Sequence, residues 1–194
     1  MRELRTAAIA ALTLTVLLGL AYPLVLTGAS QVVFPGRADG SLVRDGGRVV
    51  GSRLIGQDFA KDRGAFQSRP SVTSYRPDAT FFNNQGPNQR ALATQLKGLV
   101  ASYLERERPF TPGLRAARIP ADAVTTSASG VDPDISVANA RIQANRVARV
   151  NGLPRARVLR LIDDEAHRPL FGLAGERSVN VLALNLAVDR AVTR

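Results

Sequence analysis

One apolar segment near the N-terminus constrains this chain more than any other feature. Residues Thr6–Leu26 carry no charge, and apart from the phenol of Tyr22 their only polar side chains belong to three threonines. At about 1.5 Å rise per residue, a helix of this length spans roughly 31 Å, close to the thickness of a bilayer's hydrocarbon core. The segment predicts one transmembrane helix over residues 6–26, with the rest of the chain as a polar domain attached to it.

A cleaved signal peptide is the alternative interpretation of this segment. Arg2 and Arg5 would form its basic region, and Thr27–Ala29 would supply small residues for cleavage. The apolar core exceeds the about 7–15 residues usual in signal peptides, which favours a retained helix. Both interpretations export the domain, because the basic residues keep the N-terminus (1–5) inside and long domains translocate largely regardless of charge. We expect a linker over residues 27–47 and an extracytoplasmic domain over residues 48–194.

Small residues recur every four positions along the predicted helix. A small-xxx-small stripe lets a second helix approach closely, although a helix rich in Ala, Leu and Thr often shows one by chance. The span contains no ionisable residue and therefore offers no ion path of its own. The predicted packing face consists of Ala7, Ala11, Thr15 and Gly19.

Composition limits the domain's partners. The chain has no cysteine, which excludes disulfides and thiolate metal sites, and its net charge is +10. A basic domain beside a membrane suits anionic lipid headgroups or an acidic partner surface. We expect no nucleic-acid binding, because the basic residues are scattered and only 5% of residues are aromatic.

Periodicity and turn residues predict an α+β domain with a small sheet and about three helices. The clearest helix covers Gln89–Arg108, capped by Asn88 and ended by Pro109. Its apolar stripe, predicted to be core, consists of Leu92, Leu96, Leu99, Val100, Tyr103 and Leu104.

Two more helices and two strands complete the prediction. One helix covers about 137–150, and another begins at Pro154 with Val158, Leu161 and Ile162 facing inward. Strands are expected near residues 49–55, after a turn-rich stretch over 35–47, and over Val179–Leu182. The tail over 185–192 is compatible with a strand or a closing helical turn.

Catalytic motifs are scarce. The sequence contains neither the phosphate-binding G-x-x-x-x-G-K-[ST] pattern nor the G-x-S-x-G nucleophile elbow. His167 is the only histidine, so a zinc site would need three carboxylates, and none is expected. The acidic run Asp163–Glu165 fits a solvated helix end, because consecutive helical residues point in different directions. The chain is not expected to be an enzyme, although a hydrolase using His167 with Ser129 stays open.

The loop Thr125–Ser136 is the most unusual polar segment. Five hydroxyl side chains precede a predicted helix N-terminus. Hydroxyls and free backbone N–H groups at such a place either bind an anion or cap the helix, and capping is the simpler interpretation.

Five stretches follow one another in a fixed order along the chain: Gly51–Gln57, Arg69–Ser71 with Tyr75, the Ser127–Ser136 loop, Gln143 with Arg146–Ala148, and Val179–Leu186. This order of segments resembles the KdpC family, the C subunits of the bacterial Kdp potassium-transporting P-type ATPase. The resemblance covers nearly the whole chain, including the N-terminal helix, and carries over these positions as structural or partner-contact residues: Gly56, Gln57, Arg69, Pro70, Ser71, Tyr75, Gly86, Pro87, Ser127, Ser129, Gly130, Asp132, Pro133, Ser136, Gln143, Asn180 and Asn185. Two stretches depart from the family pattern. Residues Asn83–Gln89 replace a usual Ser-Asn-Leu-Gly-Pro-Ser-Asn run, and Asp134 stands where the family usually has His.

The resemblance implies a non-catalytic subunit of a high-affinity, ATP-driven potassium-uptake complex in a bacterial plasma membrane. Its partners would be a channel-like potassium-translocating subunit, a P-type ATPase subunit and membrane lipid. Such C subunits are described as catalytic chaperones that raise the partner's affinity for ATP. ATP and potassium would be used by the complex and not held firmly by this chain, because its domain should lie outside. The alternative is an unrelated single-pass extracytoplasmic ligand-binding protein.

Overall fold

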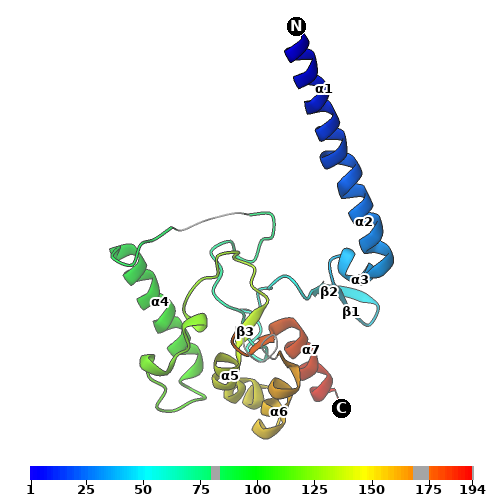
Figure 1. Ribbon diagram of the computed structural model, residues 1–194. Helices are drawn as coiled ribbons and strands as arrows, with labels where there is room; N and C mark the ends of the chain where they lie inside the picture. Colours follow the sequence, from blue (N-terminus) through cyan, green and yellow to red (C-terminus); the bar gives the residue numbers. More distant parts are fainter. Residues whose placement is uncertain (80–83, 168–174, 194) are drawn as a thin grey trace. The chain divides into compact units, whose positions relative to one another are not determined.

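The computed structural model describes residues 1–79, 84–167 and 175–193 (Figure 1). It divides into two compact units, Met1–Val50 and Gly51–Arg194. Asn83, one of the positions that depart from the family pattern, lies outside the described residues.

The first unit begins with a continuous helical run over Arg2–Val33, which contains the predicted residues 6–26 and extends beyond them. None of its residues is buried, and it is the one helix among the described residues that is long and apolar enough to cross a membrane. A π-helical turn interrupts it just before Pro23, which has no N–H to donate to the preceding turn. The run consists of α1 (Arg2–Val16), the π-helix η1 (Leu17–Ala21) and α2 (Tyr22–Val33).

A short helix and a hairpin follow, where the sequence predicted a turn-rich stretch and a strand near residues 49–55. Gly46 and Gly47 form the turn with positive φ angles of 55° and 81°, which favour glycine. The hairpin therefore lies earlier than predicted, and Leu54 and Ile55 lie in a turn after it. The elements are α3 (Pro35–Ala38), β1 (Leu42–Asp45) and β2 (Arg48–Ser52).

The second unit is built on a three-stranded antiparallel sheet of order β3-β5-β4. Ile135 of β3 and Ala166 of β4 both pair with Val179 of the central strand. The helix α5 packs on α6, and α6 packs on α7, with the main core between these helices and the sheet. The elements are β3 (Asp134–Ser136), α5 (Val137–Val150), α6 (Arg155–Glu165), β4 (Ala166–His167), β5 (Ser178–Asn180) and α7 (Val181–Val192).

The predicted α+β class is confirmed, with one more long helix than expected. The helices near 137–150 and after Pro154 are present, and the inward positions Val158, Leu161 and Ile162 are buried. The predicted strand over Val179–Leu182 is wrong in its second half. The strand ends at Asn180, whose side chain accepts the N–H of Ala183 and starts a helix that contains the whole tail.

The remaining helix, α4 (Arg90–Glu107), differs from its prediction in burial. Its bounds agree within a residue and Pro109 follows its end, but the N-cap position is Gln89, without a capping side chain. Of the six apolar stripe positions, only Tyr103 is buried and the other five are half-buried. Tyr103 belongs to a small separate cluster with Leu114 and Ala123, near the short 3₁₀ helices η2 (Ala116–Arg118) and η3 (Ala121–Ala123).

Candidate functional site

The positions carried over from the family pattern meet mainly where the irregular stretch that follows β2, from residue 53 on, crosses the loop before β3. Gly56 donates its N–H to the carbonyl of Val131 at 2.7 Å, and a side chain on Gly56 would collide with the carbonyl of Asp132. Gly130 adopts a φ of +71° against Thr73, so glycine is favoured there by conformation and by space. These two glycines let the segments approach closely.

Polar side chains fasten the same crossing. Arg69 forms an ion pair with Asp132 at 2.9 Å, and its carbonyl accepts the phenolic hydroxyl of Tyr75 at 2.6 Å. Ser71 donates its hydroxyl to the carbonyl of Gly130 at 2.6 Å. The Nε of Arg69 is buried without a partner among the described residues. The crossing is thus a small, densely bonded joint between two loops.

Hydroxyl groups of the Thr125–Ser136 loop bond to the loop's own backbone or to residues close to it in sequence. Ser127 and Ser129 accept the N–H groups of Gly130 and Val131, at 3.0 and 3.2 Å. Ser136 accepts the N–H of Asn139 at 3.0 Å and caps α5. The capping interpretation of this loop is therefore confirmed for Ser136.

Two side-chain amides hold consecutive backbone residues of the irregular stretch. Asn185 of α7 accepts the N–H of Phe66 at 2.7 Å and donates to its carbonyl at 3.1 Å. Gln143 of α5 does the same to Gln67, at 2.7 and 3.2 Å. Each amide imitates the partner strand of a sheet, so this buried backbone is satisfied without any strand pairing.

Asn180 and Pro133 join the sheet to its surroundings, and Gln57 joins two parts of the irregular stretch. The Nδ2 of Asn180 donates to the carbonyl of Arg53 at 2.9 Å, and the carbonyl of Pro133 accepts the N–H of Val181 at 2.9 Å. The carbonyl of Gln57 accepts the hydroxyl of Ser68 at 2.9 Å. These positions have structural contacts.

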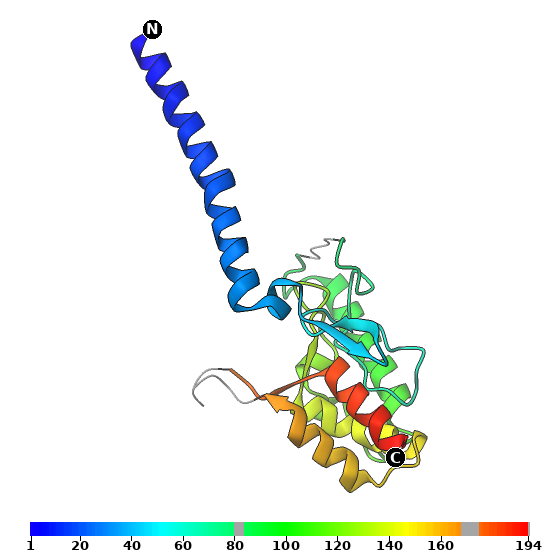
Figure 2. The same cartoon turned by 90° about the vertical axis from the view of Figure 1, so that its right-hand side faces the viewer.

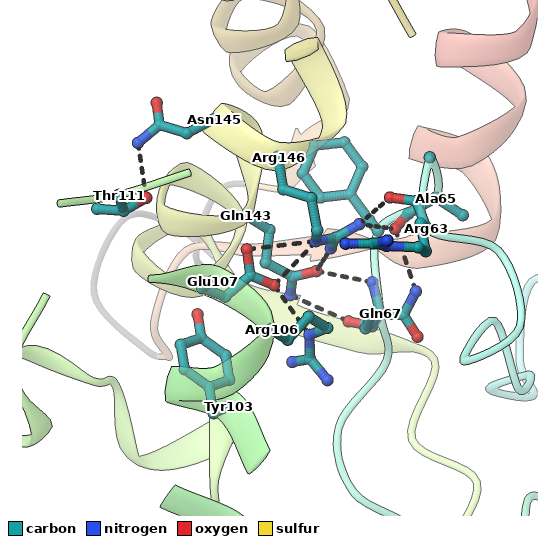
Figure 3. A network of polar contacts seen from close by, with 12 residues as sticks. Arg63, Ala65, Gln67, Tyr103, Arg106, Glu107, Thr111, Gln143, Asn145 and Arg146 are labelled. Carbon is teal, nitrogen blue, oxygen red and sulfur yellow. Dashed lines mark hydrogen bonds and ion pairs between the residues drawn. The ribbon is translucent and has the colours of Figure 1, made fainter. Parts of the chain in front are cut away.

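A buried ion pair, which the sequence analysis missed, attaches α4 to α5 (Figure 3). The Nε of Arg146 donates to Glu107 at 3.0 Å, and both side chains have at most 1% of their surface exposed. The other guanidinium nitrogens donate to the carbonyls of Arg63 and Ala65 and to Gln143. Burial lowers the pKa of Arg146, and the charge of Glu107 opposes that shift. The available signal was a charged residue on the inward face of a helix, between Gln143 and Val147.

A pocket of about 170 Å³ lies between α4 and the irregular stretch. Burial raises the pKa of Tyr75, which lines it, to about 12. The guanidinium carbon of Arg106 lies 5.1 Å from the ring centre of Tyr103, within range of a cation–π contact. The lining also includes Asp58, Ala60, Gln67, Ser68, Pro70, Leu99, Ser102 and Ala123.

Other predicted positions lie apart from this joint. Gly86 accepts the N–H of Gln89 before α4, and the neighbouring Pro87 is exposed. His167 is exposed on β4, and no hydrogen bond joins it to Ser129 in the described part of the chain. Asp163 pairs with Arg141 at 3.0 Å, and no cluster of three metal-binding side chains occurs among residues 1–79, 84–167 and 175–193. The described residues give the proposed hydrolase site no support.

The proposed helix-packing face lies in the first unit. Ala7, Ala11, Thr15 and Gly19 are all exposed, as are the large apolar side chains around them. A methyl group added at Gly19 would meet only the methyl of Thr15, at 4.0 Å. This face has room for a neighbouring helix or for lipid.

Comparisons with known proteins agree over nearly the whole chain. The family model described as KdpC, K+-transporting ATPase, c chain, matches residues 4–190. A potassium-transporting ATPase KdpC subunit of Caulobacter vibrioides is 50% identical over 190 residues, covering 96% of this chain and 92% of that protein. The subunit of Rhodopseudomonas palustris is 44% identical with complete coverage of both chains, and that of Cereibacter sphaeroides is 46% identical with 98% coverage of both. The match includes both the apolar helix and the domain.

Proposed function

The chain belongs to the KdpC family of K+-transporting ATPase c chains, and from this membership we propose how it serves its complex. It is an accessory subunit of a potassium-transporting ATPase and not the catalytic chain. Its partners are other Kdp subunits. In our proposal it holds together a channel-like potassium-translocating subunit and a P-type ATPase subunit, and it modulates the second.

The observation that carries the proposal is how the family positions are used. Four of these side chains form hydrogen bonds with the chain's own loops and backbone: those of Arg69, Ser71, Gln143 and Asn185. No cluster of metal-binding side chains occurs beside them in the described residues. A domain built this way acts by presenting a fixed surface to a partner. We propose that this surface covers the outer face of the channel-like subunit.

The proposed topology follows from the helical run Arg2–Val33. Its N-terminus lies in the cytoplasm, held by Arg2 and Arg5, and the domain lies outside the plasma membrane. The exposed apolar side chains contact lipid, and the small-residue face receives a helix of another subunit.

An effect on ATP affinity would be indirect. ATP lies in the cytoplasm, whereas the proposed domain lies outside, so coupling between the two sites must pass through the complex. We therefore propose that ATP and potassium are bound by the complex and that neither is held firmly by this chain.

The test is purification of the tagged full-length chain in mild detergent from potassium-starved cells. We expect a P-type ATPase and a large channel-like polypeptide to copurify, with potassium-stimulated ATP hydrolysis. A chain that purifies alone would instead favour an independent ligand-binding protein.

A variant ending after residue 50 tests the role of the domain. It keeps the anchor, and we expect it to lower complex stability and the apparent affinity for potassium. Unchanged values would refute a role of the domain in assembly. His167→Ala is the matched control, because this exposed side chain should not affect either measurement.

A further inference from the structure

The pocket of about 170 Å³ beside α4 is lined by the guanidinium of Arg106, which has hydrogen-bond donors without an acceptor among the described residues. We infer that it receives the carboxylate of an Asp or Glu side chain from another subunit of the potassium-transporting complex. This inference rests on the proposed assembly role and names one contact through which that role is performed. The binding group is Arg106, with Ser102 one helical turn away and the rings of Tyr75 and Tyr103 as walls.

Arg106 is held in place but only partly used. Its Nε donates to Glu107 at 2.9 Å, which fixes the guanidinium against the buried ion pair. The two terminal nitrogens have no acceptor among the described residues, and in Figure 3 they point away from the network. The contact with the ring of Tyr103 orients the plane further. A planar fork of free donors matches the two oxygens of a carboxylate.

The size of the pocket selects a side chain over a larger ligand. About 170 Å³ lies well below the volume of usual sites for small molecules. Leu99, Pro70 and Tyr103 supply apolar and aromatic walls, and 38% of the Arg106 side chain stays exposed. A charge-assisted hydrogen bond is stronger in such surroundings than in open solvent.

The negative charge of Asp58 distinguishes a carboxylate occupant of the pocket from a cationic one. Asp58 is exposed at the pocket, where one of its oxygens accepts the N–H of Ala60 at 2.8 Å. Its negative charge opposes an entering carboxylate and would favour an entering cation. Removing this charge therefore has opposite effects for the two kinds of occupant.

The first experiment uses the full-length tagged chain expressed with its native partners. We measure the salt concentration at which the partner subunits dissociate during purification, together with the fraction retained. Arg106→Gln and Ser102→Trp, which blocks the pocket without touching Glu107, should each lower partner affinity about tenfold. Arg90→Gln on the same helix is the matched control and should change little.

Partner retention by the variants distinguishes the proposed contact at Arg106 from the broader assembly role. Asp58→Asn should leave partner retention unchanged or raise it, and a fall would overturn the carboxylate assignment. If the unmodified chain retains its partners and Arg106→Gln retains them equally well, the inference fails while the assembly role stands. A urea midpoint equal to that of the unmodified chain for Ser102→Trp excludes misfolding as the cause of a loss.

A photo-crosslinking residue at Ser102 identifies the occupant. We expect a crosslink to a segment of another subunit that contains an Asp or Glu, mapped by mass spectrometry. Crosslinks only to phospholipid or only to this chain, or none at all, would overturn the inference.

Discussion

The helices α5 and α4 lie in the same unit and contact each other, yet they are buried very differently. α5 buries eight of its 14 residues, whereas the longer α4 buries two of 18. α5 packs on α6 and β3 in the main core, while α4 is attached chiefly at its C-terminal end. The difference shows that one half of this unit stabilises the fold and the other leaves an apolar helix face available for contacts.

The attachment of α4 depends on polar groups. Tyr103 donates its hydroxyl to Asn139 at 3.0 Å, and Glu107 pairs with Arg146. Both contacts lie in the last two turns of the helix, so the earlier turns have only half-buried contacts. An accessory subunit that contacts its partners through α4 would gain from this arrangement, because the core need not change when the partner binds.

The largest expected effect is the loss of the buried ion pair. Arg146→Met leaves Glu107 buried with only the half-exposed Arg106, which should cost about 3–5 kcal/mol in the free energy of unfolding. The measurement is urea unfolding of the full-length chain in mild detergent. Arg141→Met, which breaks an ion pair about half exposed on both sides, should cost less than about 1 kcal/mol. Equal costs for the two variants would contradict the burial of the pair.

The second prediction compares matched leucines in the two regions. Leu184→Ala in α7 removes a fully buried side chain and should cost about 2–5 kcal/mol. Leu96→Ala in α4 removes a half-buried one and should cost about 1 kcal/mol or less in the isolated chain. In the assembled complex the cost at Leu96 should rise if a partner covers α4. A cost at Leu96 similar to that at Leu184 in the isolated chain would remove the distinction between the two helices.

The side-chain amides of Asn185 and Gln143 lead to a prediction with a smaller and more local effect on stability. Asn185→Ala leaves the N–H and the carbonyl of Phe66 buried without a partner, at a cost of about 1–3 kcal/mol. Hydrogen exchange should then accelerate at Phe66 more than at Gln67, which Gln143 still holds. Gln143→Ala should show the reverse order. The same exchange pattern in both variants would show that the stretch opens as one piece.

Local patterns predicted the parts of this fold that depend on nearby residues. The apolar run of the first helix, the helix near 137–150 and the start of α6 after Pro154 all follow from periodicity and turn chemistry. The change from strand β5 to helix α7 was missed. The apolar run with its β-branched residues favours a strand, whereas the capping side chain of Asn180 starts a helix. Whether Asn180 caps a helix depends on its register in the sheet and on its neighbours in space, which cannot be read from the sequence.

The candidate site was predictable only in part. The family pattern located the joint around Arg69 and Gly130, although not the contacts made there. The buried ion pair of Arg146 with Glu107 was missed, because charged residues usually lie at the surface and the pair joins positions 39 apart in the sequence. The stripe of α4 was misjudged for a related reason. Periodicity shows that a face is apolar, and it cannot show whether the chain itself covers that face.

The smallest expected effect concerns the tyrosine beside α4. Burial holds the pKa of Tyr75 at about 12 in the folded chain, against about 10 when unfolded. The folded state therefore keeps this proton to higher pH, so the stabilisation it gives is complete below pH 10 and is lost as pH rises from 10 to 12. Tyr75→Phe should flatten this part of the stability profile, and the difference in tyrosinate absorbance between the two proteins should have its midpoint near pH 12. A midpoint near 10 would mean that water fills the pocket freely. The partner-accessible pocket would then be open as far as the Tyr75 side chain, in contrast to the tightly packed core.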